Sequence, residues 1–151
     1  MKTSPRTTQY GLTVFEILTV AIIITILAAI AVPNFIRSKE SAYEASLETN
    51  ARTLRVMLET YKVDHSVYPE DLRTLGRDAS KRGYNKEVPN PITSNKGLVE
   101  NGKWAVMYTG TTGPPGMVSY QPVLDKYYIF AYDAEGNLHQ RKGKVFQMSN
   151  G

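Results

Sequence analysis

The clearest chemical feature of the sequence is one carboxylate, Glu16, at the start of a long apolar segment. The 20 residues of Ile17–Ile36 that follow it are all uncharged. A carboxylate costs about 2.5–3.5 kcal/mol if it lies near the centre of a membrane helix, so it must protonate or find a cation. No lysine or arginine follows on the same helix before Arg37. The available cation is therefore a chain amine, either this chain's own or a neighbour's.

The remaining reactive side chains form no pattern for catalysis. The 151-residue chain has no cysteine and two histidines, His65 and His139, which we expect at the surface or at a helix end rather than as ligands. The acidic pairs Glu70-Asp71 and Asp133-Ala-Glu135 fall in polar stretches without a nucleophile, and we expect both to be solvated. The Gly110–Gly113 stretch lacks the Lys-Ser/Thr ending of a phosphate-binding loop. The sequence therefore predicts a protein that is not an enzyme.

Positive charge gathers in three short clusters, although the formal net charge is only +4. The clusters are Lys81-Arg82, Lys86 and Arg141-Lys142-Gly143-Lys144. A nucleic-acid site would need them on one face of the fold. A solvated surface is the simpler interpretation, and nucleic-acid binding is the alternative.

The apolar segment is long enough to cross a membrane as a helix. About 20 helical residues, each rising about 1.5 Å, span a hydrocarbon core of ~30 Å. A helix that is apolar on every face is not typical of a soluble core. Lys2 and Arg6 precede the segment, which favours an N-terminus in the cytoplasm. We therefore expect one membrane-inserted helix near the N-terminus.

An ordinary signal peptide is the alternative interpretation of the same segment. Ala29-Ile30-Ala31 fits the small-x-small cleavage pattern, and residues 17–28 would form the apolar region of such a peptide. Cleavage after Ala31 would leave a secreted or membrane-anchored binding domain that does not polymerise. Glu16 inside the apolar block, and the continuity of this block with the next helix, count against this alternative.

The most informative motif ends a short basic leader and begins the apolar segment. It consists of Gly11-Leu12-Thr13-Val14-Phe15-Glu16, and Pro33 follows 22 residues after Gly11. This pattern resembles the prepilin signature of type IV pilins and type II secretion pseudopilins. The resemblance is strong over residues 1–36 and looser over the rest of the chain.

The resemblance implies a role for each of these residues. A prepilin peptidase would cut between Gly11 and Leu12 and would methylate the new amine of Leu12. Glu16 of one subunit would neutralise the Leu12 amine of the next subunit in a fibre. Pro33 lacks an N–H and its ring crowds the preceding turn, so we expect it to kink the helix.

The rest of the chain indicates a continued helix and a small sheet. Apolar residues three and four apart predict one helix from near Leu12 to near Val63. These residues are Tyr43, Leu47, Ala51, Leu54, Leu58 and Tyr61. Leu72 and Leu75 then fit a short helix, and the breaker-rich residues 76–103 predict a surface loop.

Five runs of aromatic and β-branched residues predict strands after this loop. They are Trp104–Thr109, Met117–Val123, Tyr127–Tyr132, Leu138–Arg141 and Val145–Met148. An antiparallel sheet on the helix would bury the apolar faces of both, which predicts an α+β fold. The resemblance implies that this fold is pilin-like. Without cysteine, the C-terminus must be held by strand pairing or packing.

We therefore expect five segments along the chain. They are a cleaved leader (1–11), a transmembrane or fibre-core helix (12–36), its amphipathic continuation (37–66), a loop region with a short helix (67–103) and the antiparallel sheet of the head (104–151). The expected location is the cytoplasmic membrane, crossed once, and later a periplasmic or extracellular fibre.

The resemblance also implies partners. These are further copies of the chain and other pilin-like subunits, prepilin peptidase, an assembly platform with its motor ATPase, and the lipid bilayer before assembly. No cofactor is expected. Calcium, which major pseudopilins bind in a C-terminal loop, is an alternative near Asp125 and Asp133, although their spacing is not that of an EF-hand. The sequence leaves open whether the fibre serves a pilus, secretion or DNA uptake.

Overall fold

The structure is a computed structural model that describes residues 11–150. Residues 1–10 of the expected leader, with Lys2 and Arg6, lie outside this range. The chain forms two compact units whose boundary lies between Lys39 and Glu40, and each unit is described by itself. In the described residues the first unit is apolar helix, and the second is the folded head.

Helix α1 (Val14–His65) contributes to both units and confirms the predicted helix from near Leu12 to near Val63. It continues through Pro33 without interruption. In the head its buried positions recur every three or four residues, which is the spacing of one helix face. They are Leu47, Asn50, Ala51, Leu54, Met57, Leu58 and Tyr61. The predicted apolar stripe is therefore the core-facing side of α1, with Tyr43 half-buried at its N-terminal end.

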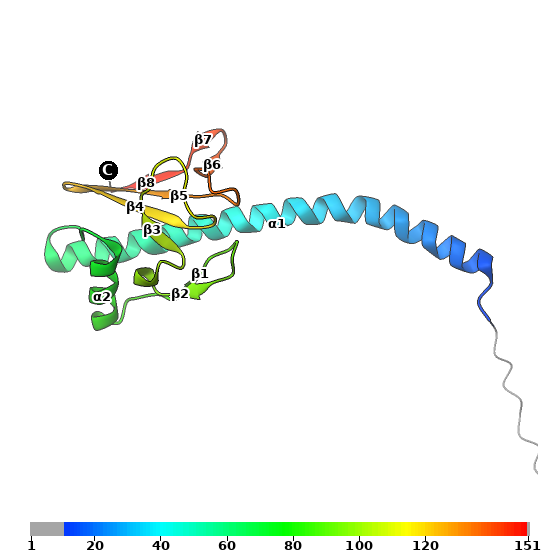
Figure 1. Cartoon of the computed structure of the whole chain (residues 1–151), viewed down its shortest axis with the longest axis horizontal. Helices are drawn as coiled ribbons and strands as arrows, with labels where there is room; N and C mark the ends of the chain where they lie inside the picture. Colours follow the sequence, from blue (N-terminus) through cyan, green and yellow to red (C-terminus); the bar gives the residue numbers. More distant parts are fainter. Residues whose placement is uncertain (1–10, 151) are drawn as a thin grey trace, which may run out of the picture. The chain divides into compact units, whose positions relative to one another are not determined.

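A four-stranded sheet packs on this face of α1, and Figure 1 shows it along one side of the helix. Its strands, in spatial order, are β3 (Ala105–Met107), β4 (Val118–Val123), β5 (Lys126–Ala131) and β8 (Gln147–Ser149). Two small hairpins join β1 (Val88–Pro89) to β2 (Lys96–Gly97) and β6 (Gln140–Arg141) to β7 (Lys144–Val145). Trp104, Tyr120 and Ile129 are fully buried between sheet and helix. The predicted α+β architecture is confirmed.

Strand β3 differs from the expected antiparallel sheet because it runs parallel to β4. The pairs β4–β5 and β5–β8 are antiparallel, as predicted. A parallel pair needs a connection of about a dozen residues rather than a tight turn. Residues 108–117, which include the Gly113–Gly116 run, form this connection.

Helix α2 (Leu72–Arg82) extends into the residues that were predicted as a surface loop. The carboxylate of Asp71 caps its first turn by accepting a hydrogen bond from a backbone N–H at 2.6 Å. Gly83, with φ of 81°, ends the helix in the left-handed conformation that favours glycine. Leu72 and Leu75 face the core, as predicted. A 3-10 turn, η1 (Val99–Asn101), packs against α2.

The loop between β1 and β2 is fastened by Asn90, a fully buried polar residue. Its side-chain amide donates to the Pro115 carbonyl at 3.0 Å. Its Oδ1 accepts from the backbone N–H groups of Ile92 and Thr93 at 2.8 and 3.0 Å. Gly116 lies against it with φ of 71°, and a Cβ there would collide with the Asn90 oxygen. One amide therefore positions two loops.

The C-terminus is held by strand pairing and packing, as the absence of cysteine predicts. Strand β8 pairs with β5, and the Asn150 amide donates to the Tyr68 hydroxyl at 3.1 Å and to the Asp125 carbonyl at 2.9 Å. Glu59 of α1 accepts hydrogen bonds from Tyr127 at 2.6 Å and from Tyr68 at 3.2 Å. Burial and the bond to Glu59 raise the pKa of Tyr127 above its ordinary value. These contacts tie the sheet to α1.

His65 lies at the end of α1, as expected, within a charged cluster that joins α1 to α2. Its Nε2 is 3.0 Å from Asp78 Oδ1. Arg82 donates to the same oxygen at 3.1 Å, and the Tyr84 hydroxyl donates to the other at 2.6 Å. Burial by itself raises the pKa of Asp78, but the bonds from Tyr84 and His65 and the charge of Arg82 together hold it below its ordinary value.

His139 is buried at 4% exposure, so the expected surface position is wrong. Its backbone N–H donates to Ala131, and its carbonyl accepts from the Phe146 N–H. These two bonds place it between β5 and the segment after β7. Its ring lies 5.8 Å from the Phe146 ring, and no pattern in the neighbouring residues signals this enclosure.

Candidate functional site

Thr13 and Glu16 form a reciprocal pair at the N-terminus of α1. Glu16 Oε2 accepts hydrogen bonds from the Thr13 backbone N–H at 2.8 Å and from the Thr13 hydroxyl at 2.7 Å. Thr13 Oγ1 accepts from the Glu16 N–H at 3.2 Å. This arrangement is a capping box, which satisfies N–H groups that the first helical turn leaves open. The Thr-x-x-Glu spacing signals it in the sequence, and the prediction of an amine partner alone overlooked this role.

Glu16 has no ion pair within residues 11–150. The first cation after it, Arg37, lies roughly 30 Å along the helix at 1.5 Å per residue. Its carboxylate is therefore satisfied by Thr13 alone in the described part of the subunit. The amine partner and the kink at Pro33 stay predictions.

Gly11 and Leu12 precede α1 and lie outside regular secondary structure. The Leu12 side chain is 78% exposed, and a Cβ built on Gly11 meets no described atom within 4 Å. Exposed irregular backbone is where proteolysis concentrates. The peptide bond between these two residues is therefore open to a protease in the described structure.

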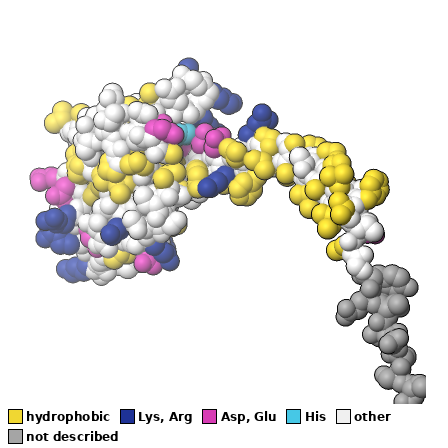
Figure 2. All heavy atoms as spheres, turned by 45° about the vertical axis from the view of Figure 1, so that its right-hand side comes forward, with side chains coloured by type: hydrophobic (Ala, Val, Ile, Leu, Met, Phe, Trp, Pro, Cys, Tyr) yellow, Lys and Arg dark blue, Asp and Glu magenta, His cyan; other side chains and the backbone are white. Residues whose placement is uncertain are grey.

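Large hydrophobic side chains coat α1 from Val14 to Ile36 and are uncovered (Figure 2). Their exposed fractions range from 50% at Ile36 to 85% at Val14. Among the described residues, α1 is the helix long and apolar enough to cross a membrane. An apolar surface of this extent marks a membrane or protein interaction site. Lipid or other helices must cover it.

Two threonines interrupt the apolar sequence without making the surface polar. The Thr19 hydroxyl donates to the Phe15 carbonyl at 2.9 Å, and the Thr25 hydroxyl donates to the Ala21 carbonyl at 2.8 Å. Each hydroxyl is satisfied within its own helix, as a lipid or fibre-core environment requires.

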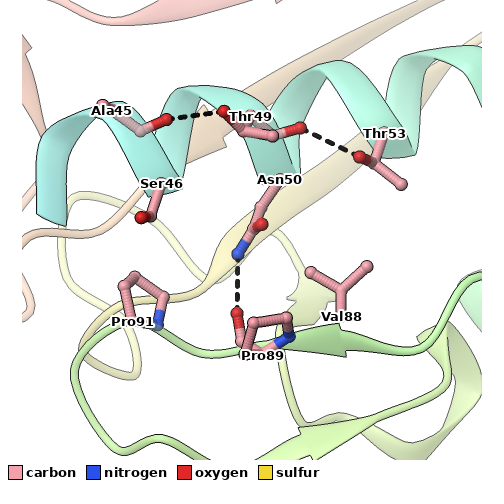
Figure 3. A pocket seen from close by; sticks show the side chains of 8 residues that line it. All are labelled: Ala45, Ser46, Thr49, Asn50, Thr53, Val88, Pro89 and Pro91. Carbon is pink, nitrogen blue, oxygen red and sulfur yellow. Dashed lines mark hydrogen bonds between the residues drawn. The ribbon is translucent and has the colours of Figure 1, made fainter. Parts of the chain in front are cut away.

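The head carries a groove of about 400 Å³ beside α1 (Figure 3). Across it, the Asn50 amide donates to the Pro89 carbonyl at 3.0 Å. The lining contains no titratable side chain, and its three hydroxyls, those of Ser46, Thr49 and Thr53, donate to carbonyls of their own helix.

The residues of the two alternative sites, for calcium and for nucleic acid, lie on separate elements. Asp125 and Asp133 lie at opposite ends of β5, and Asp133 is engaged by backbone N–H groups of the following turn. No group of three metal-binding side chains occurs among the described residues. Of the basic clusters, Lys81-Arg82 lies on α2 and Arg141–Lys144 forms the β6–β7 hairpin.

Comparison with curated proteins gives relatives of two kinds. The chain is 30% identical over 122 residues to the type II secretion system core protein G of Dickeya chrysanthemi, covering 72% of this chain and 80% of the relative. It is 31% identical over 121 residues to core protein G of Escherichia coli K12, covering 72% and 83%. It is 32% identical over 95 residues to the competence protein ComGC of Halalkalibacterium halodurans, covering 60% and 89%. No protein-family model and no solved structure matches the chain.

Proposed function

Because this chain belongs to the pilin-like family that contains the type II secretion system core protein G, we propose that it is a structural subunit of a pseudopilus-like fibre. The main support for this function is that the same chain has a folded head and a helix whose apolar side chains are exposed. Such a helix suits two apolar environments in turn, first lipid and then the core of a fibre. The chain acts mechanically rather than as an enzyme.

In the proposed pathway, the precursor lies in the inner membrane with its N-terminus in the cytoplasm. Prepilin peptidase cuts between Gly11 and Leu12 and methylates the new amine of Leu12. The exposure of both residues ahead of α1 supports this step. Residues 12–36 then serve as membrane anchor and fibre core, and residues 37–66 carry the head.

During assembly, the Glu16 carboxylate exchanges its capping bonds with Thr13 for the Leu12 amine of the next subunit. The absence of an ion pair on Glu16 in residues 11–150 supports this exchange. Lipid and fibre core are both apolar, so little hydrophobic free energy separates the two states. A platform and a motor ATPase supply the energy of extraction, and copies of this chain with other pilin-like subunits form the fibre.

The relatives favour secretion as the task of this fibre, because core protein G is the name that most of them carry. DNA uptake is the second candidate, and the competence relative supports it. A signal peptide cleaved after Ala31 finds no support, since that cut would fall inside the unbroken α1.

The test is the N-terminal residue of the mature protein. We expect sequencing of chain produced with prepilin peptidase to begin at Leu12 carrying one added methyl group, and we expect fibres by electron microscopy. Gly11→Val should leave the precursor uncut without disturbing the head, because Gly11 precedes α1 and a Cβ added there meets no described atom within 4 Å. A chain beginning at Val32 would instead indicate a signal peptide, and an uncut chain would indicate a plain anchor.

A further inference from the structure

The β6–β7 hairpin carries three cations, Arg141, Lys142 and Lys144, and is called the basic arm below. Its charge pairing and its turn conformation are both unfavourable. Arg141 and Lys144 lie directly opposite each other in its ladder, and like charges in that position destabilise a sheet. Lys142 occupies the turn with φ of 52°, a left-handed conformation that glycine or asparagine adopts more readily. All three side chains are exposed, and Figure 1 shows the hairpin apart from the four-stranded sheet. Local conflicts of this kind are expected at functional sites.

Three glutamates form an acidic ladder on α1 beside this arm. Glu40, Glu44 and Glu48 follow one another at intervals of four, so they share one helix face with steps of about 6 Å. The Glu48 carboxylate binds Arg141 Nη1 at 3.2 Å. Glu40 and Glu44 are exposed and have no ion pair within residues 11–150.

Within the subunit, one of the three cations of the arm, Arg141, forms an ion pair, and the other two do not. Lys142 and Lys144 have no ion pair in the described chain, and neither do Glu40 and Glu44. Arg141 fixes the arm at Glu48, whereas Glu40 lies about 12 Å farther along the helix. A second copy displaced along the fibre axis would bring its own arm to Glu40 and Glu44.

We propose that Lys142 and Lys144 of one subunit bind Glu40 and Glu44 of an adjacent copy in the fibre. The inference rests on the proposed function, because it needs subunits arranged along an axis. The carboxylates of the neighbour also relieve the repulsion between Arg141 and Lys144. Nucleic acid fits the arm less well, because its phosphates would approach the glutamates beside it.

Disulfide crosslinking tests the contact directly, because the chain contains no cysteine of its own. In a chain carrying Glu44→Cys and Lys144→Cys, oxidation of intact fibres should give dimers and higher multimers. The same chain in detergent, before assembly, should stay monomeric. The matched control, Glu44→Cys with Lys81→Cys on α2, should give no multimers. Normal fibres that yield no crosslink, or only an internally bridged monomer, would overturn the contact.

Charge reversal gives a second measurement that does not depend on cysteine. Lys142→Glu with Lys144→Glu should lower fibre yield about tenfold, and adding Glu40→Lys with Glu44→Lys to the same chain should restore it. Arg73→Glu with Lys81→Glu, on exposed positions of α2, changes the net charge equally and should have no effect. Unchanged yield in the first variant, with loss of duplex DNA binding, would overturn the contact in favour of nucleic acid. Absence of fibres from the unmodified chain would overturn the proposed function and this contact with it.

Discussion

The observed capping role of Glu16 and its proposed pairing with the Leu12 amine can be separated by substitution. Glu16→Gln keeps the shape and the hydrogen-bonding atoms of the capping box, because glutamine also serves at this position. It removes the negative charge. Thr13→Ala does the reverse, since it removes the hydroxyl that bonds to Glu16 at 2.7 Å and keeps the carboxylate. The two variants therefore act on different halves of one small motif.

The two losses differ in size. A helix cap contributes about 1 kcal/mol, which corresponds to roughly fivefold in an equilibrium constant. An ion pair separated by about 4 Å, in surroundings with an effective dielectric constant near 20, contributes about 4 kcal/mol. The second figure, taken as an upper bound before the desolvation of both charges is subtracted, corresponds to several hundredfold in the affinity of one subunit for the next. The charge should therefore dominate assembly, and the cap should have a minor effect.

Fibre yield, measured on sheared and sedimented material at equal expression, separates these outcomes. We expect Thr13→Ala to retain fibres with a loss of at most about fivefold, and Glu16→Gln to reduce them below detection. Circular dichroism of the full chain in detergent is the control that the helix survives. If Glu16→Gln assembles as well as the unmodified chain, amine pairing is refuted and capping suffices.

Three further predictions concern the head, studied in the full chain in detergent. Asn90→Ala leaves the Pro115 carbonyl and two N–H groups without their partner, so it should cost about 2 kcal/mol and lower Tm by about 10 °C in calorimetry; the exposed Asn95→Ala should leave Tm unchanged. Because the pKa of Asp78 is lowered on folding, its stabilisation is complete above its ordinary pKa of 3.8 and is lost as pH falls through the lowered value. Urea unfolding of Asp78→Asn should therefore show a smaller loss of stability between pH 7 and pH 3, and an equal loss would contradict the assignment. Lys142→Asn should raise Tm by a few degrees because asparagine tolerates positive φ, yet it should lower fibre yield.

The elements of the fold were predictable where the signal is local. The repeat from Leu47 to Tyr61 predicts the buried face of α1, and aromatic runs predict β4 and β5, because periodicity depends only on neighbouring residues. The direction of β3 and the enclosure of His139 were not predictable, because both depend on partners distant in sequence. Asn90 lies in a Pro-Asn-Pro string that signals a turn. Its buried hydrogen bond to Pro115, 25 residues later, was not predictable because it depends on the folded position of that residue.

At the candidate site, the processing of Gly11 and Leu12 and the amine pairing of Glu16 stay predictions, and the capping contact of Glu16 was overlooked. Gly11, Leu12 and Glu16 form a motif that can be recognised along the chain. The charge of Glu16 predicts a cation as its partner, whereas Thr13, three residues earlier, already donates two hydrogen bonds to its Oε2 in the subunit.

The self-bonded hydroxyls of Thr19 and Thr25 have a consequence for movement. A helix whose threonines grip a neighbour would resist axial sliding at each such contact. Here both hydroxyls donate to carbonyls of their own helix, so neither offers a hydrogen bond to a neighbouring helix. In the proposed extraction from lipid, no lateral hydrogen bond donated by either threonine would have to break.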